Sequence, residues 1–293
     1  MECKPPCALM VFVDGLGLGS EDPAVNPVQD GGCPFLSLLL KQHAVPVDAC
    51  LDVPGIPQSA TGQTALLTGV NAPKAVGRHV EGFPGPELKA IIEKENIFSR
   101  LLARGYTATF ANAYFFDDVE QVRQMRRHSV TTVSTLQAFG QVRDAKALLA
   151  NKAVYQDLTR EKLRPRGYTG PLLTPAESAG HLMDIAREHD FSLFEFFQTD
   201  LAAHSGSLSE MKRVLGHLDE FLRGLRTFWE EPGNLFILTS DHGNIEDATT
   251  RSHTRNPVPF VALGEGAEGL KREVKTLADF VPAVMKLFPG GGM

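Results

Sequence analysis

The sequence has few of the residues that stabilise small secreted domains, and it has no segment typical of a membrane protein. Its 293 residues include 4 cysteines, 1 tryptophan and 4 tyrosines. No apolar run approaches the roughly 20 residues that a membrane-spanning helix needs. The formal net charge of −6 argues against a general role on nucleic acids or membrane surfaces. Because 43% of the residues are hydrophobic, we expect a globular protein with a sizeable buried core.

The cysteines and the first residues of the chain both favour a cytoplasmic location. Cys3, Cys7, Cys33 and Cys50 show no spacing typical of a strong metal site, and we expect these thiols to stay reduced. The N-terminal apolar stretch is too short for a signal peptide and runs into a predicted strand. We therefore expect a cytoplasmic protein whose partners include neither nucleic acid nor membrane.

The segment 239–260 carries the strongest sign of chemistry in this chain. Asp241, His242 and His253 lie within 13 residues, just after the apolar run 235–238, which fits a buried strand. Open α/β sheets bind their ligands at the carboxyl ends of the strands. Carboxylate and imidazole groups together suit a divalent ion such as zinc or manganese. The segment therefore predicts part of a metal site.

Two further apolar runs also end near an aspartate. One ends at Asp14, beside glycines that allow a sharp turn, and the other ends at Asp200, with His204 four residues later. Because positions i and i+4 share one face of a helix, Asp200 and His204 can reach the same ion. Any single aspartate of this kind is commonly a turn or capping residue. The recurrence at three predicted strand ends favours a site for two metal ions.

A candidate nucleophile lies in the segment 54–73. Ser59 follows a turn rich in proline and glycine and begins a helix-compatible run that stops at Gly69. Backbone N–H groups at a helix N-terminus suit an anion such as phosphate or sulfate. Ser59 could also be a simple N-cap, and Thr61 and Thr64 are competing hydroxyl groups. Periodicity alone does not choose among them.

Together these motifs resemble the alkaline phosphatase superfamily, and most closely the metal-binding core of cofactor-independent phosphoglycerate mutases. The resemblance is carried by 241–244 (DHGN), 253–259 (HTRNPVP), Asp200-x-x-x-His204 and 13–15 (VDG). Ser59, three residues before Gly62, stands where the mutase pattern has its nucleophilic serine. Counting back from Thr68-Gly69, as in the related nucleotide pyrophosphatases, reaches the same serine.

The resemblance implies two divalent metal ions, manganese or zinc, and a small phosphorylated substrate. One ion would be held by Asp200, His204 and His253, and the other by Asp14, Asp241, His242 and the Ser59 oxygen. Ser59 would attack phosphorus to give a phosphoserine, which water or a second hydroxyl group would then cleave.

The chain also departs from the mutase pattern. Those mutases insert a large second domain between the nucleophile and the next aspartate, whereas only 140 residues separate Ser59 from Asp200 here. We expect a doubly wound, three-layer αβα sandwich with a mainly parallel sheet, formed by residues 1–115 and 174–293. Residues 116–173 are left as a small cap insertion, too small to be the second domain of the mutases.

The small cap favours a hydrolase of a small phosphomonoester or phosphodiester. A phosphomutase of the same superfamily is the alternative interpretation, and a non-catalytic metalloprotein is the third. The expected cap carries two basic clusters, which form either a solvated face or a contact for an anionic substrate. The candidate substrate-binding residues are Arg123, Arg126 and Arg127 in the first cluster, together with Arg78 and His79 in the loop after the Ser59 helix.

Local patterns predict several further elements. The segment 96–115 reads as a helix, a stop at Gly105 and a strand, and 174–191 reads as a helix leading into a strand. We expect one amphipathic helix over 207–231, opened by a capping box at Ser207 and carrying an exposed Asp219.

Overall fold

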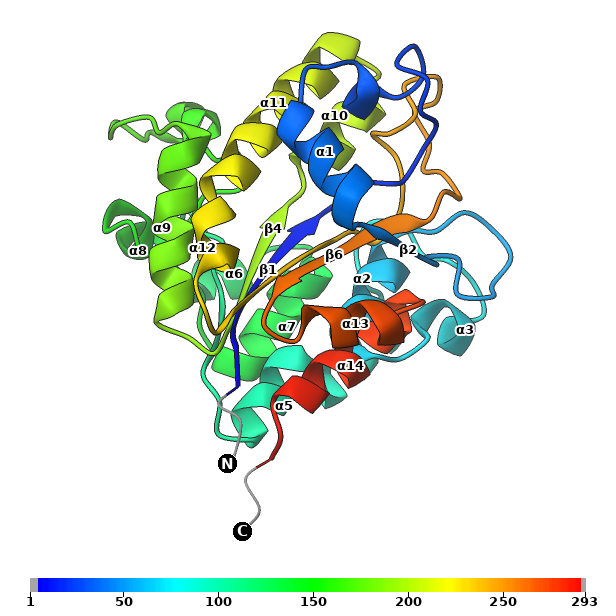
Figure 1. Cartoon of the computed structure of the whole chain (residues 1–293). Helices are drawn as coiled ribbons and strands as arrows, with labels where there is room; N and C mark the ends of the chain where they lie inside the picture. Colours follow the sequence, from blue (N-terminus) through cyan, green and yellow to red (C-terminus); the bar gives the residue numbers. More distant parts are fainter. Residues whose placement is uncertain (1–4, 291–293) are drawn as a thin grey trace.

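The computed structural model describes residues 5–290, which form a six-stranded sheet between two layers of helices (Figure 1). The strands are β1 (Cys7–Val13), β2 (Val45–Val47), β3 (Ala108–Phe110), β4 (Phe191–Phe196), β5 (Asn234–Thr239) and β6 (Val258–Gly264). Their order across the sheet is β2-β6-β5-β1-β4-β3. The β3, β4, β1 and β5 strands run parallel, whereas β6 is antiparallel to β5 and β2 is antiparallel to β6. The predicted mainly parallel sheet is therefore confirmed.

Strand β1 lies in the middle of the sheet and is buried on both faces. Its alternate side chains enter different parts of the core: Met10 and Phe12 pack in one hydrophobic cluster, and Leu9 and Val11 pack in the other. Parallel strands that are covered on both faces read as nearly continuous apolar runs rather than as alternating ones. This double burial explains the uninterrupted apolar sequence that precedes Asp14.

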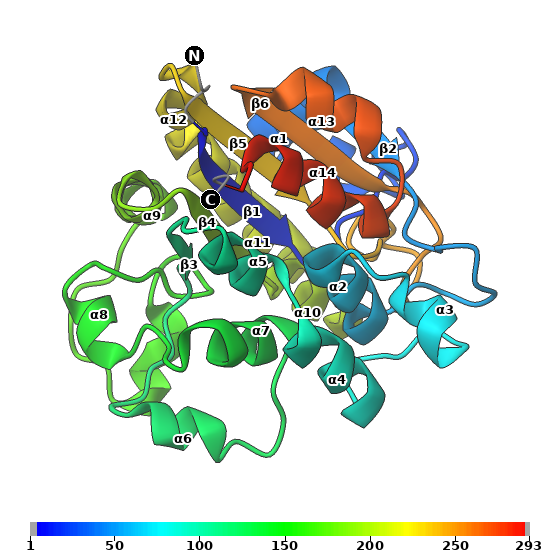
Figure 2. The ribbon, with the colours of Figure 1, turned by 90° about the horizontal axis from the view of Figure 1, so that it is seen from below.

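Helices cover both faces of the sheet, as Figure 2 shows from a second direction. One layer consists of α1 (Pro34–His43), α9 (Pro175–Arg187), α10 (Gln198–Ser205), α11 (Leu208–Gly224) and α12 (Arg226–Glu230). The other consists of α2 (Ser59–Thr68), α3 (Ala72–Val76), α4 (Pro86–Lys94), α5 (Ile97–Ala103), α7 (Val130–Phe139), α13 (Ala267–Glu273) and α14 (Phe280–Leu287). The remaining short helices are α6 (Val119–Arg123), α8 (Ala145–Leu149), η1 (Pro27–Gln29), η2 (Glu161–Arg166) and η3 (Leu277–Asp279). The three-layer αβα architecture is thus confirmed.

Most of the local predictions agree with the structure. Helix α5 ends just before Gly105, whose φ of 83° lies in the left-handed region that favours glycine, and β3 follows. Helix α9 begins with a complete capping box, in which the Thr174 and Glu177 side chains each accept from the backbone N–H of the other residue. Among residues 5–290, no helix has both the length and the apolar composition needed to cross a membrane.

The segment 207–231 differs from its prediction in three respects. Ser207 is the N-cap and accepts from the N–H of Glu210, but the Glu210 carboxylate pairs with Arg213 and does not complete the capping box. The helix is interrupted at Leu225 and divides into α11 and α12. Asp219, expected to be exposed, is buried, and its Oδ1 accepts a hydrogen bond of 2.8 Å from the N–H of Leu36. The N-cap of α1, Cys33, provides no side-chain acceptor, so Asp219 satisfies an N–H group of that first turn from a distant helix.

Residues 116–173, which the sequence marks as a cap, contribute to two different regions. Helix α7 packs against α4 and α5, and its Val130 and Val133 belong to the main core. Tyr155, Leu163 and Tyr168 belong instead to a small separate hydrophobic cluster. The division of the chain into a core and a cap stays a prediction.

Candidate metal centre

The three central strands β4, β1 and β5 bring the predicted metal ligands to one edge of the sheet. Since these strands are parallel neighbours, their carboxyl ends lie side by side. Asp14 follows β1 directly, and Asp241 and His242 follow β5. Strand β4 ends at Phe196, so Asp200 is not the last residue of the strand as expected but lies in the first turn of α10. All three aspartates nevertheless meet at this edge.

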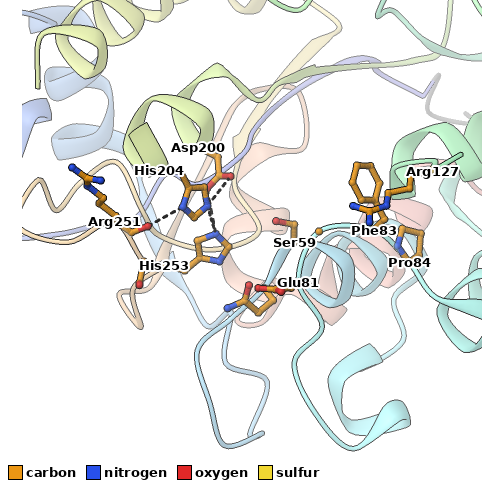
Figure 3. A pocket seen from close by; sticks show the side chains of 12 residues that line it. Ser59, Glu81, Phe83, Pro84, Arg127, Asp200, His204, Arg251 and His253 are labelled. Atoms are coloured by element: carbon orange, nitrogen blue, oxygen red, sulfur yellow. Dashed lines mark hydrogen bonds and ion pairs between the residues drawn. The ribbon is translucent and has the colours of Figure 1, made fainter. Parts of the chain in front are cut away.

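Asp200, His204 and His253 form the first cluster (Figure 3). The Nε2 atom of His204 lies 3.3 Å from Asp200 Oδ2, and the Nε2 atom of His253 lies 3.4 Å from Asp200 Oδ1. The two Nε2 atoms are 3.0 Å apart. Helix α10 places His204 one turn after Asp200, as the i, i+4 spacing predicts, and the loop between β5 and β6 supplies His253.

Asp14, Asp241 and His242 form a second, fully buried cluster. The Nε2 atom of His242 lies 3.3 Å from Asp14 Oδ1 and 3.5 Å from Asp241 Oδ2. These two carboxylate oxygens have no hydrogen-bond partner, although both are buried. A buried carboxylate oxygen without a partner is costly, and a bound cation would remove that cost. The carboxylate oxygens and imidazole nitrogens of both clusters are therefore suitable ligands for a divalent ion.

The three histidines are oriented in the same way. Each turns its Nδ1 towards a backbone carbonyl oxygen, with distances of 2.8 Å from His204 to Arg251, 3.3 Å from His242 to Gly243 and 3.0 Å from His253 to Pro57. A carbonyl oxygen only accepts, so each Nδ1 donates a hydrogen bond and the ring directs its Nε2 atom towards the centre. Metal-ligating histidines are held in this way.

Burial and neighbouring charges shift the pKa values of the three aspartates at the centre. Burial raises the pKa of Asp14 well above its ordinary value, and the charges of Asp241 and Asp200 raise it further. Burial likewise raises the pKa of Asp241. Burial opposes ionisation of Asp200 as well, but the hydrogen bond from His253, the charge of His242 and the hydrogen bond from Asn244 together outweigh it and lower that pKa to about 2.

The pKa of His253 shifts in the direction opposite to that of Asp200. Burial lowers the pKa of its imidazole, but the hydrogen bond to Asp200, the charge of Asp200 and the hydrogen bond to the Pro57 carbonyl together outweigh burial and raise it. The raised pKa reflects the negative charge that Asp200 and Asp241 place beside this ring.

Ser59 lies beside the second cluster. It is the first residue of α2, and Gln58 rather than Ser59 is the N-cap, so the structure contradicts the simple N-cap interpretation. The Oγ atom of Ser59 lies 3.0 Å from His242 Nε2. A Cβ at Gly62 would lie 2.8 Å from the carbonyl oxygen of Asp241, so the absence of a side chain there allows α2 to approach the loop after β5.

The two competing hydroxyl groups are engaged in hydrogen bonds with the backbone, and that of Thr61 also accepts from the Val80 N–H at 3.2 Å. The hydroxyl of Thr61 donates to the Gln58 carbonyl at 3.2 Å, and that of Thr64 donates to the Ala60 carbonyl at 2.6 Å. Of the three candidates, only Ser59 has its hydroxyl group beside the metal-ligand clusters.

Two amides that the sequence interpretation missed hold the aspartates in place. Asn244 Nδ2 donates to Asp200 Oδ1 at 2.6 Å, and Gln63 Nε2 donates to Asp14 Oδ2 at 3.3 Å. Such hydrogen bonds fix the orientation of a ligand. Both residues carry a sequence signal, because Asn244 lies within the motif of His242 and Gln63 lies one helical turn after Ser59.

Glu246, also missed, connects the loops that follow β1 and β5. It is completely buried and accepts hydrogen bonds from the N–H groups of Gly17 at 2.9 Å and Asn244 at 2.7 Å, and from Asn256 Nδ2 at 3.1 Å. No lysine or arginine within residues 5–290 forms an ion pair with it. No pattern distinguishes this glutamate from a surface residue in the sequence.

The predicted substrate-binding residues lie in different places. Arg127 borders an open cleft of about 880 Å³ that also borders Ser59 and both histidines of the first cluster. Arg78 and His79 border an adjacent hollow, which shares Gln58 with this cleft. Arg251, which the sequence interpretation did not select, also borders the cleft.

The other two arginines of the first basic cluster face elsewhere. Arg123 pairs with Glu120 at 3.2 Å and donates to the carbonyl of Gly140 at 2.7 Å, beside a separate hollow. Arg126 is exposed. A role in substrate binding stays a prediction for all five residues.

Comparison with known proteins now identifies the family. The sequence matches the metalloenzyme superfamily over residues 6–289. The chain belongs to this superfamily. The predicted membership of the alkaline-phosphatase-like metalloenzymes is thereby confirmed, and these are metal-dependent phosphoryl-transfer enzymes that include phosphatases and phosphoglycerate mutases.

One curated relative of this metalloenzyme agrees with that assignment. Over 125 residues the chain is 34% identical to a 2,3-bisphosphoglycerate-independent phosphoglycerate mutase of Natronomonas pharaonis, a match that covers 38% of this chain and 25% of the mutase. The chain thus matches about a quarter of the length of that curated relative.

Solved structures share the fold at low sequence identity. The alkaline phosphatase of Thermus thermophilus superposes with a TM-score of 0.59 at 12% identity, covering 99% of this chain and 92% of the phosphatase. The Leishmania mexicana phosphoglycerate mutase gives a TM-score of 0.54 at 12% identity, covering 100% of this chain and 97% of the mutase.

Proposed function

We propose that this metalloenzyme is a hydrolase that cleaves a phosphomonoester or phosphodiester through a phosphoserine on Ser59. The observation that carries the proposal is the position of Ser59 Oγ, 3.0 Å from His242 and beside two clusters that fit divalent ions. Asp200, His204 and His253 would hold one ion, and Asp14, Asp241, His242 and Ser59 would hold the other. Manganese or zinc suits these ligands.

When bound, the two ions would supply positive charge that lowers the pKa of the Ser59 hydroxyl group and neutralises the phosphoryl oxygens. The chain contributes the nucleophile and its orientation. Ser59 Oγ forms a bond to phosphorus while the bond from phosphorus to the ester oxygen breaks and the alcohol leaves. The N–H groups of the first turn of α2 favour the negative charge of the phosphoryl group. Water then cleaves the bond from phosphorus to Ser59 and restores the serine hydroxyl group, releasing phosphate from a monoester or the remaining phosphomonoester from a diester.

A phosphomutase is the second candidate, and the sequence match to the phosphoglycerate mutases favours it. In that reaction the phosphoserine would return its phosphoryl group to another hydroxyl group of the substrate, which requires a site closed against water. The His204 side chain is 44% exposed in this structure. This access for water favours hydrolysis.

The test is release of phosphate from an aryl phosphate by protein loaded with manganese or zinc, measured together with metal content. We expect chelation to abolish turnover and Ser59→Ala to lower it by a factor on the order of 10³ or more. The matched control is Thr61→Val, which removes a hydroxyl group from the same helix and should retain most of the turnover.

Turnover that survives Ser59→Ala would overturn the serine mechanism. Conversion of a substrate into its positional isomer without free phosphate would instead establish the mutase. Failure to bind either metal would show that the ligand assignment is wrong.

A further inference from the structure

A second cavity opens beside Ser59, and its walls are aromatic. Its volume is about 480 Å³, within the range of small-molecule sites, and Asp14, Ser59 and Asp200 border one end of it. The lining also includes Phe110, Tyr114, Phe115, Tyr155 and Phe197, together with polar side chains such as those of Asn112 and Glu195. The cavity therefore continues from the candidate metal centre into an apolar pocket.

The mouth of this aromatic pocket carries large apolar side chains that are exposed to solvent. Phe83 is 45% exposed, Met125 is 40% exposed and Leu201 is 51% exposed. They come from three separate segments: the loop before α4, the loop after α6, and α10. Exposed apolar side chains that gather at one opening mark a binding surface, whereas single ones are common on any protein.

Two arginines place their guanidinium groups over aromatic rings of the pocket. The guanidinium carbon of Arg127 is 5.5 Å from the centre of the Phe83 ring, and that of Arg166 is 4.9 Å from the centre of the Phe116 ring. An Nη of Arg166 also donates to the Phe115 carbonyl at 2.8 Å. Stacked guanidinium groups keep their charge at the wall without filling the cavity. This positive charge suits a ligand with a phosphate group.

We propose that the natural substrate is a phosphate ester whose alcohol carries an aromatic or similarly bulky apolar group. This inference rests on the proposed function: the phosphate lies at Ser59, and the organic group enters the aromatic pocket. An aromatic group would remove apolar wall area from water and can pack against the edges and faces of the surrounding rings. A short polar acid would leave most of that wall uncovered.

The first test measures binding without catalysis. The manganese-loaded protein is titrated by calorimetry with 3-phenylpropylphosphonate and with propylphosphonate, whose P–C bonds are not cleaved. We expect the phenyl compound to bind at least tenfold more tightly, a difference of about 1.4 kcal/mol. Equal affinities, or no binding of either phosphonate, would overturn the proposal.

The second test measures selectivity in turnover. The esters 3-phenylpropyl phosphate and propyl phosphate release alcohols of similar acidity, so the ratio of their kcat/KM values reports the pocket rather than the leaving group. We expect Phe83→Ala and Met125→Ser each to lower this ratio at least threefold. Leu38→Ser, which removes a side chain that is 51% exposed on the distant helix α1, should leave the ratio unchanged.

The outcomes distinguish failure of the aromatic subsite from failure of the proposed hydrolase. A general structural defect would lower turnover of both esters alike, and a ratio that neither pocket substitution changes would overturn the aromatic subsite. If neither ester releases phosphate, the proposed hydrolase fails. The calorimetric comparison still decides whether the pocket selects an aromatic group.

Discussion

Each aspartate and histidine of the two clusters is held by a neighbouring group that is not itself a candidate ligand. The ring of His253 is fixed by the Pro57 carbonyl, and the carboxylate of Asp200 is fixed by Asn244. These contacts restrict the side-chain rotamers before any ion is present. Less conformational entropy is therefore lost when an ion binds, and the affinity for that ion is correspondingly higher.

Glu195, on β4, links the stability of this metalloenzyme to pH. Burial raises the pKa of its carboxyl group to about 7, although a hydrogen bond of 2.6 Å from Thr131 partly offsets burial. The folded state thus holds this proton more tightly than the unfolded state does. Its contribution to stability is fully present below the ordinary pKa of 4.5 and is lost as the pH rises through about 7.

Glu195→Gln should remove that dependence. As the pH rises from 4.5 through about 7, the free energy of unfolding of the metal-free wild type should fall by on the order of 3 kcal/mol relative to that of the variant. Urea denaturation in the presence of a chelator, at several pH values, measures the difference. Parallel curves for the two proteins would show that the carboxyl group does not titrate in this range.

The loops after β1 and β5 depend on each other through Glu246. Glu246→Ala leaves the N–H groups of Gly17 and Asn244 without their acceptor in a buried region. We expect the free energy of unfolding to fall by about 3 kcal/mol, because each unpaired buried donor is costly. Urea denaturation measures this change. Glu265→Ala, at an exposed position after β6, should change it by less than about 0.5 kcal/mol, and a loss below about 1 kcal/mol for Glu246→Ala would contradict the prediction.

The elements that carry the site could be predicted because each has a local pattern. An apolar run followed by Asp14 identifies a buried strand and its carboxyl end, and the spacing of Asp200 and His204 identifies one helical turn. Asp219 and Glu246 lack such a pattern. Their partners are Leu36 and Gly17, which lie far away in the sequence, so the burial of these carboxylates follows only from the three-dimensional arrangement.

The substrate side of the site was harder to predict for a similar reason. A basic cluster looks the same in the sequence whether it faces solvent or a cleft. Arg127 reaches the cleft, whereas Arg123 is engaged with Glu120 and the Gly140 carbonyl. The aromatic pocket is formed by segments that are distant in the chain, and no single segment indicates it.

At the scale of the whole molecule, metal binding should stabilise the fold, because the ligands are together only in the folded state. An ion present at 100 times its dissociation constant adds about 2.7 kcal/mol. Two ions should therefore raise the Tm by roughly 5–10 °C over the metal-free protein. Scanning calorimetry with manganese and with a chelator measures this shift.

A matched pair of variants locates the effect. His204→Ala should lose a large part of the shift, whereas His181→Ala, on α9 and outside both clusters, should retain it. An unchanged Tm on chelation of the wild type would contradict the prediction.

The central position of β1 has a consequence for synthesis on the ribosome. This strand is translated before the other five strands, yet its neighbours on both sides are β4 and β5, which begin at Phe191 and Asn234. Both edges of an apolar strand therefore stay unpaired until most of the polypeptide has been translated. Pairing over such long distances is slow, and unpaired apolar edges promote aggregation. Nascent chains of this protein should thus depend on chaperones until the last third of the sequence has left the exit tunnel.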